Sequence, residues 1–281
     1  MSLFRKQSPV EDERFLPSQG IINARDIGGY RMQDGRVVRK GRLLRGATLS
    51  SATDEDIKLL MDFGTVKVFD FRSDFEKRGK LDRTFPSAQF IDLPISTFDP
   101  ADAPPSVTRG KSFDLKKVIM IAAFNEQAQK SADRMYPILV EQEGCQRQFA
   151  AFLRMVVDTP DGAVFFHCTQ GKDRTGLAAA YLLSALGASR ETVIEDFDLT
   201  NRVYERDLKK FSRRVKLLGG GEPALTVIRS FIGANTENFV KTLEDIDRKY
   251  GSMHAYLTGP LGLTDYDMEI LKERYLVKGE L

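Results

Sequence analysis

Cys168 and Arg174 are the residues of this sequence whose types and spacing point most directly to chemistry, because only five residues separate them. A thiolate is a strong nucleophile, and the pKa of a thiol falls when it lies at a helix N-terminus beside cations. A guanidinium presents a planar fork of donors that can hold two oxygens of a phosphoryl group. The spacing therefore indicates a nucleophile and an anion clamp within the segment His167-Cys168-Thr169-Gln170-Gly171-Lys172-Asp173-Arg174-Thr175-Gly176.

The elements on either side are expected to shape this segment into a binding loop. Ala163 to Phe166 is an apolar run that suits a strand buried on both faces, and Leu177 to Leu186 suits a buried helix. A tight loop between a strand and a helix directs backbone N–H groups at one point, which favours phosphate or another oxyanion. We therefore expect a phosphate-binding loop made of Thr169, Gln170, Gly171, Lys172, Asp173 and Arg174.

Two other interpretations of the segment compete with this one. A nucleotide-binding loop of the Walker A type would need Gly at position 166 and Ser or Thr at position 173. The sequence has Phe166 and Asp173 there, so that interpretation fails. An inert, buried cysteine is what most free cysteines are, and Cys168 taken alone would fit that description.

The rest of the chain predicts the order β, α, β, β before the strand, loop and helix just described, which is compatible with an α/β fold. Residues 98–111 are rich in proline and predict a loop that could act as a lid. The other expected elements are short strands and turns in residues 21–44, a helix over 53–64, strands at 66–72 and 89–94, helices at 115–124, 146–157 and 204–218, and further helices toward the C-terminus.

Composition narrows the class of protein. A chain of 281 residues with 42% hydrophobic and 29% charged residues is globular rather than disordered or fibrous. The net charge of +2 provides no global field for nucleic-acid binding, so no nucleic-acid partner is expected. Two cysteines and two histidines cannot furnish a disulfide framework or a paired Cys/His zinc site.

Hydropathy and one basic helix indicate whether the protein is expected to insert into or contact a membrane. The longest apolar stretch is too short to span a bilayer, and the N-terminus has no apolar core of a signal peptide. We therefore expect no stable membrane insertion and a cytoplasmic protein, with unconventional export left open. The helix at 204–218 has a basic face from Arg202 to Lys216, which is either a solvated surface or a site of attraction to an anionic partner or membrane.

The whole segment also resembles the signature loop of the cysteine-dependent phosphatases, and in particular the bacterial and fungal tyrosine phosphatases of the PtpB and LipA type. Other stretches resemble landmarks of that family: Asn23-Ala24-Arg25-Asp26-Ile27-Gly28-Gly29, Arg45-Gly46-Ala47, Asp70-Phe71-Arg72-Ser73, Asp198-Leu199-Thr200-Asn201 and Leu261-Gly262-Leu263. The resemblance implies an α/β cysteine-phosphatase fold with a central parallel-rich sheet flanked by helices. It also implies an N-terminal arm, 1–19, and a single tyrosine-phosphatase-like catalytic domain, 20–281.

The resemblance further implies a two-step mechanism without metal or cofactor. The Cys168 thiolate attacks phosphorus and forms a phosphocysteine, while Arg174 and the loop amides stabilise the transition state. Asp173 is the expected general acid and Asp70 the alternative, with Asp99 and Asp102 as weaker candidates. Thr175 is expected to donate its hydroxyl to the Cys168 sulfur, His167 to orient the loop, and Cys145 and His254 to be structural.

The implied substrates are phosphorylated proteins, with phosphotyrosine first and phosphoserine, phosphothreonine or phosphoinositides as a broader range. Two alternatives remain open. A dedicated phosphoinositide phosphatase would use Lys172 for multiply charged headgroups and the basic helix for membrane attraction. A non-catalytic phosphate-binding module would keep Arg174 and the amides without turnover. Whether residues 98–131 form a lid is also open.

Overall fold

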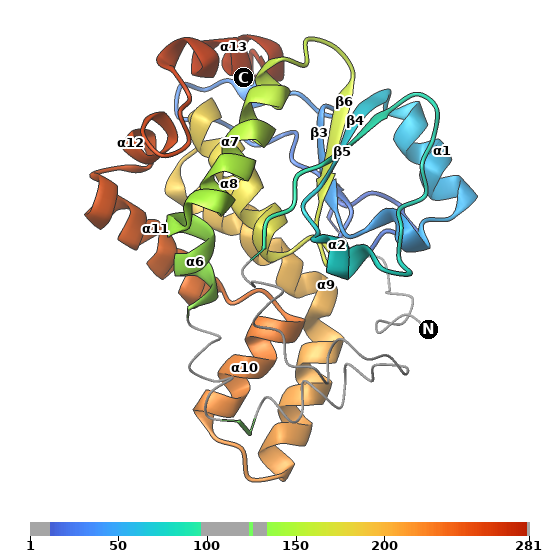
Figure 1. Ribbon diagram of the computed structural model, residues 1–281, viewed down its shortest axis with the longest axis vertical. Helices are drawn as coiled ribbons and strands as arrows, with labels where there is room; N and C mark the ends of the chain where they lie inside the picture. Colours follow the sequence, from blue (N-terminus) through green and yellow to red (C-terminus); the bar gives the residue numbers. More distant parts are fainter. Residues whose placement is uncertain (1–11, 97–123, 126–133, 280–281) are drawn as a thin grey trace.

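The computed structural model describes residues 12–96, 124–125 and 134–279, and its centre is a five-stranded sheet (Figure 1). The strand β1 is antiparallel to β3, and all other neighbours in this sheet are parallel. A separate pair joins β2 (Val37–Val38) to β7 (Leu276–Val277). Across the main sheet the order is β1 (Arg25–Asp26), β3 (Leu43–Gly46), β6 (Ala163–His167), β4 (Thr65–Asp70) and β5 (Gln89–Asp92).

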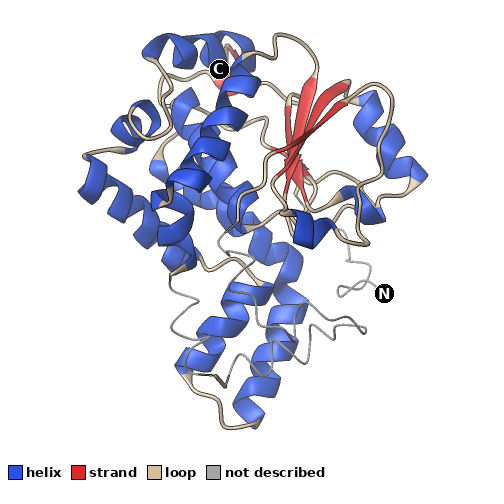
Figure 2. Cartoon of the chain, in the orientation of Figure 1, coloured by secondary structure: helices blue, strands red, loops and turns tan. Residues whose placement is uncertain are grey.

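Helices cover both faces of the main sheet (Figures 1 and 2), so the predicted α/β class with a parallel-rich sheet is confirmed. On one face α1 (Asp54–Asp62) contacts β4, and on the other α8 (Asp173–Leu186) contacts β3 and β6. The other helical elements are a 3-10 turn (Leu49–Ser51), α2 (Asp74–Lys77), α6 (Met135–Glu141), α7 (Glu143–Val157), α9 (Arg190–Leu217), α10 (Glu222–Ile232), α11 (Thr236–Tyr250), α12 (Met253–Thr258) and α13 (Asp265–Tyr275).

The largest hydrophobic core fixes the strand that leads into the loop. Every residue of β6 is buried, because the strand is central and both faces of the sheet are covered. The Phe152 ring lies 5.1 Å from both the Phe69 ring and the Phe166 ring, centroid to centroid. Full burial of such a side chain contributes about 1.5–3 kcal/mol, so the carboxyl end of β6 is rigidly held.

Two helices begin earlier than their sequence patterns predict. α8 begins at Asp173 rather than at Leu177, which places the polar end of the segment in the first helical turn. α9 begins at Arg190 rather than at Tyr204, because Ser189 caps the helix and an earlier buried face extends it toward the N-terminus. The other predicted helices and strands that fall on described residues are present within a few residues of their expected ends.

The N-terminal residues that the structure describes contact the edge of the main sheet at β1. Within the predicted N-terminal arm, Phe15 forms a bridge with Arg25, and the Leu16 backbone N–H donates to the Ala24 carbonyl at 3.0 Å. Residues 97–123 and 126–133 lie outside the described residues, and with them the predicted helix at 115–124, nearly all of the candidate lid, Asp99 and Asp102. None of the helices in the described ranges is long and apolar enough to cross a membrane.

Candidate active site

The predicted loop lies at the carboxyl end of β6 and closes with a tight turn. Gly171 has a φ of +64°, and a Cβ atom at this position would lie 2.2 Å from the Gly46 carbonyl oxygen. Only glycine adopts this left-handed conformation without cost and also allows so close an approach to the β3 backbone. The chain therefore turns sharply at Gly171 and continues directly into α8 at Asp173.

Donors from outside the loop hold its carbonyl groups. The Gly171 carbonyl accepts hydrogen bonds from Asn23 Nδ2 at 2.8 Å and from Arg45 Nη2 at 3.0 Å. The Gln170 carbonyl accepts from the Tyr204 hydroxyl at 3.1 Å. Three side chains from outside the loop therefore fix the carbonyl groups at its turn.

A buried ion cluster supports these donors. Asp196 of α9 accepts from Arg25 Nε at 3.0 Å and pairs with Arg45, and all three side chains are almost completely buried. Burial raises the pKa of Asp196, but the two guanidinium groups outweigh this and lower it, so the carboxylate stays charged. The cluster joins the stretches around positions 25, 45 and 196 into one support for the loop.

Asp196→Ala should lower the free energy of unfolding by about 3–5 kcal/mol, because it leaves two buried guanidinium groups without their carboxylate. Urea unfolding of the variant measures this loss. Asp198→Ala is the matched control: within the described part of the chain that exposed carboxylate bonds Asn201 and Thr236 alone, and its loss should cost no more than about 1 kcal/mol. Equal losses in the two variants would contradict a supporting role for the buried cluster.

Cys168 follows β6 directly and is buried. Burial raises the pKa of its thiol, but the charge of Arg174, the hydroxyl of Thr175 and the backbone N–H of Lys172 outweigh burial and lower it. The Thr175 hydroxyl is buried and has no hydrogen-bond partner among the described residues, and it is one of the groups that lower the pKa of Cys168. The folded protein thus stabilises the Cys168 thiolate relative to that of an ordinary thiol.

Arg174 points across the mouth of the loop to a carboxylate from α2. Its Nη1 and Nη2 atoms donate to Glu76 Oε2 and Oε1 at 2.8 and 2.6 Å. Nη1 also donates to the backbone carbonyls of Phe71 and Ile95, both at 3.1 Å. Contacts with three segments of the chain therefore hold the guanidinium in one orientation without substrate.

Glu76 is a site residue that the sequence analysis did not find. Burial raises the pKa of its carboxyl, yet hydrogen bonds from Arg174 and Thr169 together with the Arg174 charge lower it to about 2. The Thr169 hydroxyl donates to Glu76 Oε1 at 2.6 Å. In the sequence Glu76 forms a capping box with Ser73, and that local role accounts for its presence without any site.

Among the described residues, the side chains of Tyr136 and Lys172 are the partners of the Asp173 carboxylate. The Tyr136 hydroxyl donates to Asp173 Oδ1 at 2.7 Å, and Lys172 Nζ lies 3.3 Å from Oδ2. Lys172 also donates to the Ser230 carbonyl of α10 at 2.5 Å and is buried. The Lys172 side chain is therefore directed away from the loop mouth, whereas its backbone N–H contributes to the environment of Cys168.

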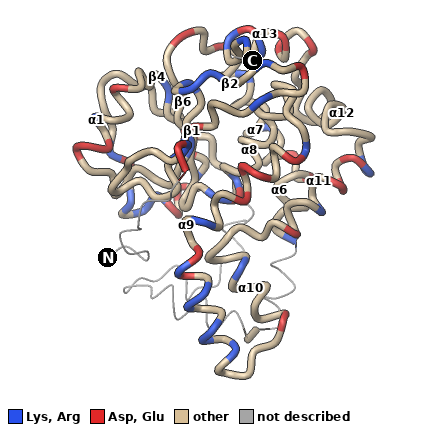
Figure 3. Tube along the Cα trace, turned by 180° about the vertical axis from the view of Figure 1, so that it is seen from behind, with Lys and Arg blue, Asp and Glu red and all other residues tan. Residues whose placement is uncertain are grey.

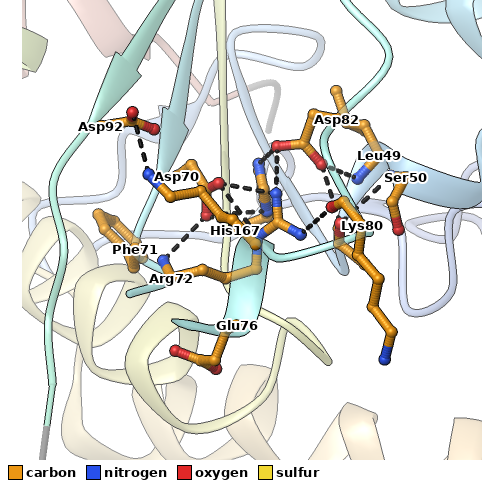
Figure 4. Close-up of polar contacts among 12 residues, drawn as sticks. Leu49, Ser50, Asp70, Phe71, Arg72, Glu76, Lys80, Asp82, Asp92 and His167 are labelled. Carbon is orange, nitrogen blue, oxygen red and sulfur yellow. Dashed lines mark hydrogen bonds and ion pairs between the residues drawn. The ribbon is translucent and has the colours of Figure 1, made fainter. Parts of the chain in front are cut away.

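Asp70 belongs to a separate network beneath the loop (Figure 4). Its carboxylate pairs with Arg72 at 2.8 Å, and Arg72 pairs with Asp82 at 2.8 Å. His167 Nε2 lies 3.1 Å from Asp82, and this carboxylate raises the pKa of the imidazole although burial lowers it. Asp70, Asp82 and His167 lie close enough to ligate a metal ion, but the Arg72 guanidinium already provides the positive charge among them.

The two remaining candidates lie apart from the loop chemistry. Cys145 is a buried free thiol on α7, with its sulfur 3.6 Å from the Ser96 carbonyl. His254 is exposed and lies 3.3 Å from Asp265. Both positions are consistent with the structural roles expected from the sequence.

The structure has an α/β fold in which Cys168 and Arg174 share one loop at the carboxyl end of β6, and comparison with known proteins identifies the family. Residues 16–277 match the tyrosine phosphatase family, so the protein belongs to that family, as predicted. A Cupriavidus necator protein named as a candidate tyrosine-protein phosphatase is 27% identical over 95% of this chain and 90% of its own. The triple specificity protein phosphatase PtpB of Mycobacterium tuberculosis is 26% identical over 87% of this chain and 92% of its own.

Proposed function

We propose that this protein hydrolyses phosphotyrosine through a phosphocysteine intermediate. The observation that carries the proposal is the lowered pKa of Cys168 within a loop that opens α8 and is faced by Arg174. The thiolate attacks phosphorus, so an S–P bond forms while the P–O bond to the tyrosine breaks. Arg174 and the loop N–H groups bind the equatorial oxygens as negative charge develops on them.

We assign the general acid to Asp173 and an anchoring role to Asp70. Asp173 lies in the first turn of α8 and is partly exposed, while Asp70 is buried and engaged by Arg72. In the first step Asp173 gives its proton to the leaving tyrosyl oxygen. In the second step it accepts a proton from the water that attacks phosphorus, the S–P bond breaks, and Thr175 stabilises the departing thiolate.

Asp173→Asn should lower kcat/KM, which reports the step in which the leaving group departs, about 100-fold for a phosphotyrosine peptide, because general acid catalysis contributes factors of roughly 10² to 10⁴. The loss should shrink for aryl phosphates whose leaving groups need no proton. Phosphate release from a series of aryl phosphates, measured with a chelator present, gives this dependence. A uniform loss across the series would show that Asp173 is not the acid.

Tyr136 is proposed as a positioning residue for Asp173. Burial and the neighbouring carboxylate raise the pKa of Tyr136 well above its usual value, so its hydroxyl stays protonated and donates to Oδ1. Tyr136→Phe removes this single bond while keeping the ring that packs near Phe197 and Phe239. We expect kcat to fall about 10-fold with poor leaving groups and about 2-fold with good ones.

The same series of aryl phosphates tests the Tyr136 assignment. Tyr181→Phe is the matched control, because it removes another buried hydroxyl about two helical turns along α8 from Asp173. A Tyr136→Phe loss that is independent of the leaving group would indicate general disturbance of the site instead.

We propose a broader range that includes phosphoserine, phosphothreonine and phosphoinositides, supported by the name of the triple specificity relative. The buried position of Lys172 does not add a free cation for a multiply charged headgroup, so phosphotyrosine remains the first substrate. A reducing compartment such as the cytoplasm is proposed because Cys168 must stay a free thiol. Comparing turnover of phosphopeptides with turnover of phosphoinositide vesicles tests the substrate range. Absence of turnover on both would favour a non-catalytic phosphate-binding module.

A further inference from the structure

The helices α9 and α10 form a lobe that projects from the body of the protein (Figure 1). The lobe has its own small core, in which Phe211 and Val215 of α9 pack with Leu225 and Ile228 of α10. Its base lies at the loop, where the Tyr204 hydroxyl bonds the Gln170 carbonyl. About 20 Å of helix separates Tyr204 from the end of α9, at a rise of about 1.5 Å per residue.

Lys and Arg positions recur along the part of α9 that lies in this lobe (Figure 3). Lys209 pairs with Glu205, and Arg202 pairs with Asp12, so these two charges are partly compensated. The chain as a whole carries a net charge of only +2, so the local concentration is not a general property of the surface. Five exposed cations form no ion pair with any residue that the structure describes: Arg206, Lys210, Arg213, Arg214 and Lys216.

Apolar side chains lie at the end of the same lobe. Leu217 is 81% exposed and Leu218 is 60% exposed, and the turn Gly219–Gly221 follows them. An exposed leucine by itself is ordinary, but two adjacent ones at a projecting end, next to uncompensated cations, form an amphipathic surface. Membrane-interface segments combine these two features, because apolar side chains enter the acyl boundary while Lys and Arg meet the headgroups.

We propose that this basic and apolar end of the lobe docks on the surface of an anionic lipid bilayer. A nucleic acid or an acidic protein would satisfy the cations but would leave Leu217 and Leu218 in water, whereas a bilayer accommodates both features. Docking would place Tyr204, which bonds the loop, about 20 Å of helix from the end that contacts the bilayer. The proposal concerns binding alone and does not depend on the substrate proposed above.

The test is sedimentation of the full-length protein with vesicles of phosphatidylcholine, with and without phosphatidylserine. We expect binding only when phosphatidylserine is present, and weaker binding as salt is raised. The combined variant Lys210→Glu, Arg213→Glu and Arg214→Glu should weaken this binding by about 100-fold or more, since each cation contributes about 5-fold at such a surface. The control carries an identical change of charge at exposed sites on the body: Arg39→Glu, Lys241→Glu and Lys278→Glu.

A second pair of variants tests the apolar contribution. Leu217→Ser with Leu218→Ser should weaken vesicle binding about 10-fold, whereas Met61→Ser with Tyr266→Ser, which removes exposed apolar side chains elsewhere, should not. Turnover of a small aryl phosphate shows that each variant is folded. The proposal is overturned if the protein does not bind the anionic vesicles, or if the control charge reversal weakens binding equally. It is also overturned if an acidic polypeptide binds the lobe more tightly than vesicles do and the leucine variants bind both as tightly as wild type.

Discussion

Cys168→Ser should lower kcat for a phosphotyrosine peptide by at least about 10⁴-fold, because a serine hydroxyl at this position lacks the thiolate that the site stabilises. The loop N–H groups and Arg174 remain, so the variant should still bind the peptide with an affinity close to the wild-type value. Stopped hydrolysis with retained binding, measured by phosphate release and by calorimetry, is the expected result.

Cys145→Ser is the control for this variant, because it changes the other buried cysteine of the chain. We expect its kcat to stay within about 3-fold of wild type, since Cys145 has no place in the proposed steps. Alkylation by iodoacetate provides a second readout: a thiol with a lowered pKa reacts at a pH where an ordinary buried thiol does not. Retained turnover in Cys168→Ser would exclude a thiolate nucleophile.

Arg174→Lys should lower kcat/KM by about 10³-fold, even though the positive charge is kept. A lysine cannot match the planar fork that binds two equatorial oxygens at once, and it cannot reproduce the two-pronged contact with Glu76. The loss should fall on kcat more than on the affinity for the product phosphate, because the fork follows the oxygens into the transition state.

Arg190→Lys is the control for this variant, because it makes the same substitution at an arginine that pairs with Asp247 outside the site. That variant should show wild-type kinetics. If Arg174→Lys loses less than about 10-fold in kcat/KM, the charge alone suffices and the forked geometry is not part of the mechanism.

The arrangement of the loop residues could be predicted because these residues are adjacent in the chain. Strand, loop and helix follow one another within a short segment, so residue types and hydrophobic periodicity place Cys168, Arg174 and Thr175 together. The apolar run of β6 likewise identified a strand with no solvent face. These predictions needed no long-range contact.

The support of the loop could not be predicted, because it depends on residues far apart in sequence. Asp196 and Arg25 are separated by 171 positions, and Asp196 precedes the helix that periodicity predicts at 204–218. Tyr204 fits the apolar face of α9, which conceals the hydroxyl that bonds Gln170. Glu76 has a complete local role in its capping box, so nothing in the sequence marks it as the partner of Arg174.

For Lys172 the sequence position suggests a ligand-binding cation that the structure does not provide. A lysine inside an anion-binding loop indicates an extra cation for the ligand. The fold instead buries its side chain between Asp173 and the Ser230 carbonyl, because α10 packs against this side of the loop. The lysine therefore links the loop to the lobe, and the cations available to an anionic surface lie further along α9.

The most direct test of the mechanism is to trap the covalent intermediate. Wild-type protein is mixed with a phosphotyrosine peptide, quenched in acid within the first turnover, digested and examined by mass spectrometry. The mechanism predicts phosphate on the fragment that contains Cys168, its absence in Cys168→Ser, and its accumulation in Thr175→Ala. Phosphate on another residue, or turnover without any phosphorylated fragment, would contradict the mechanism.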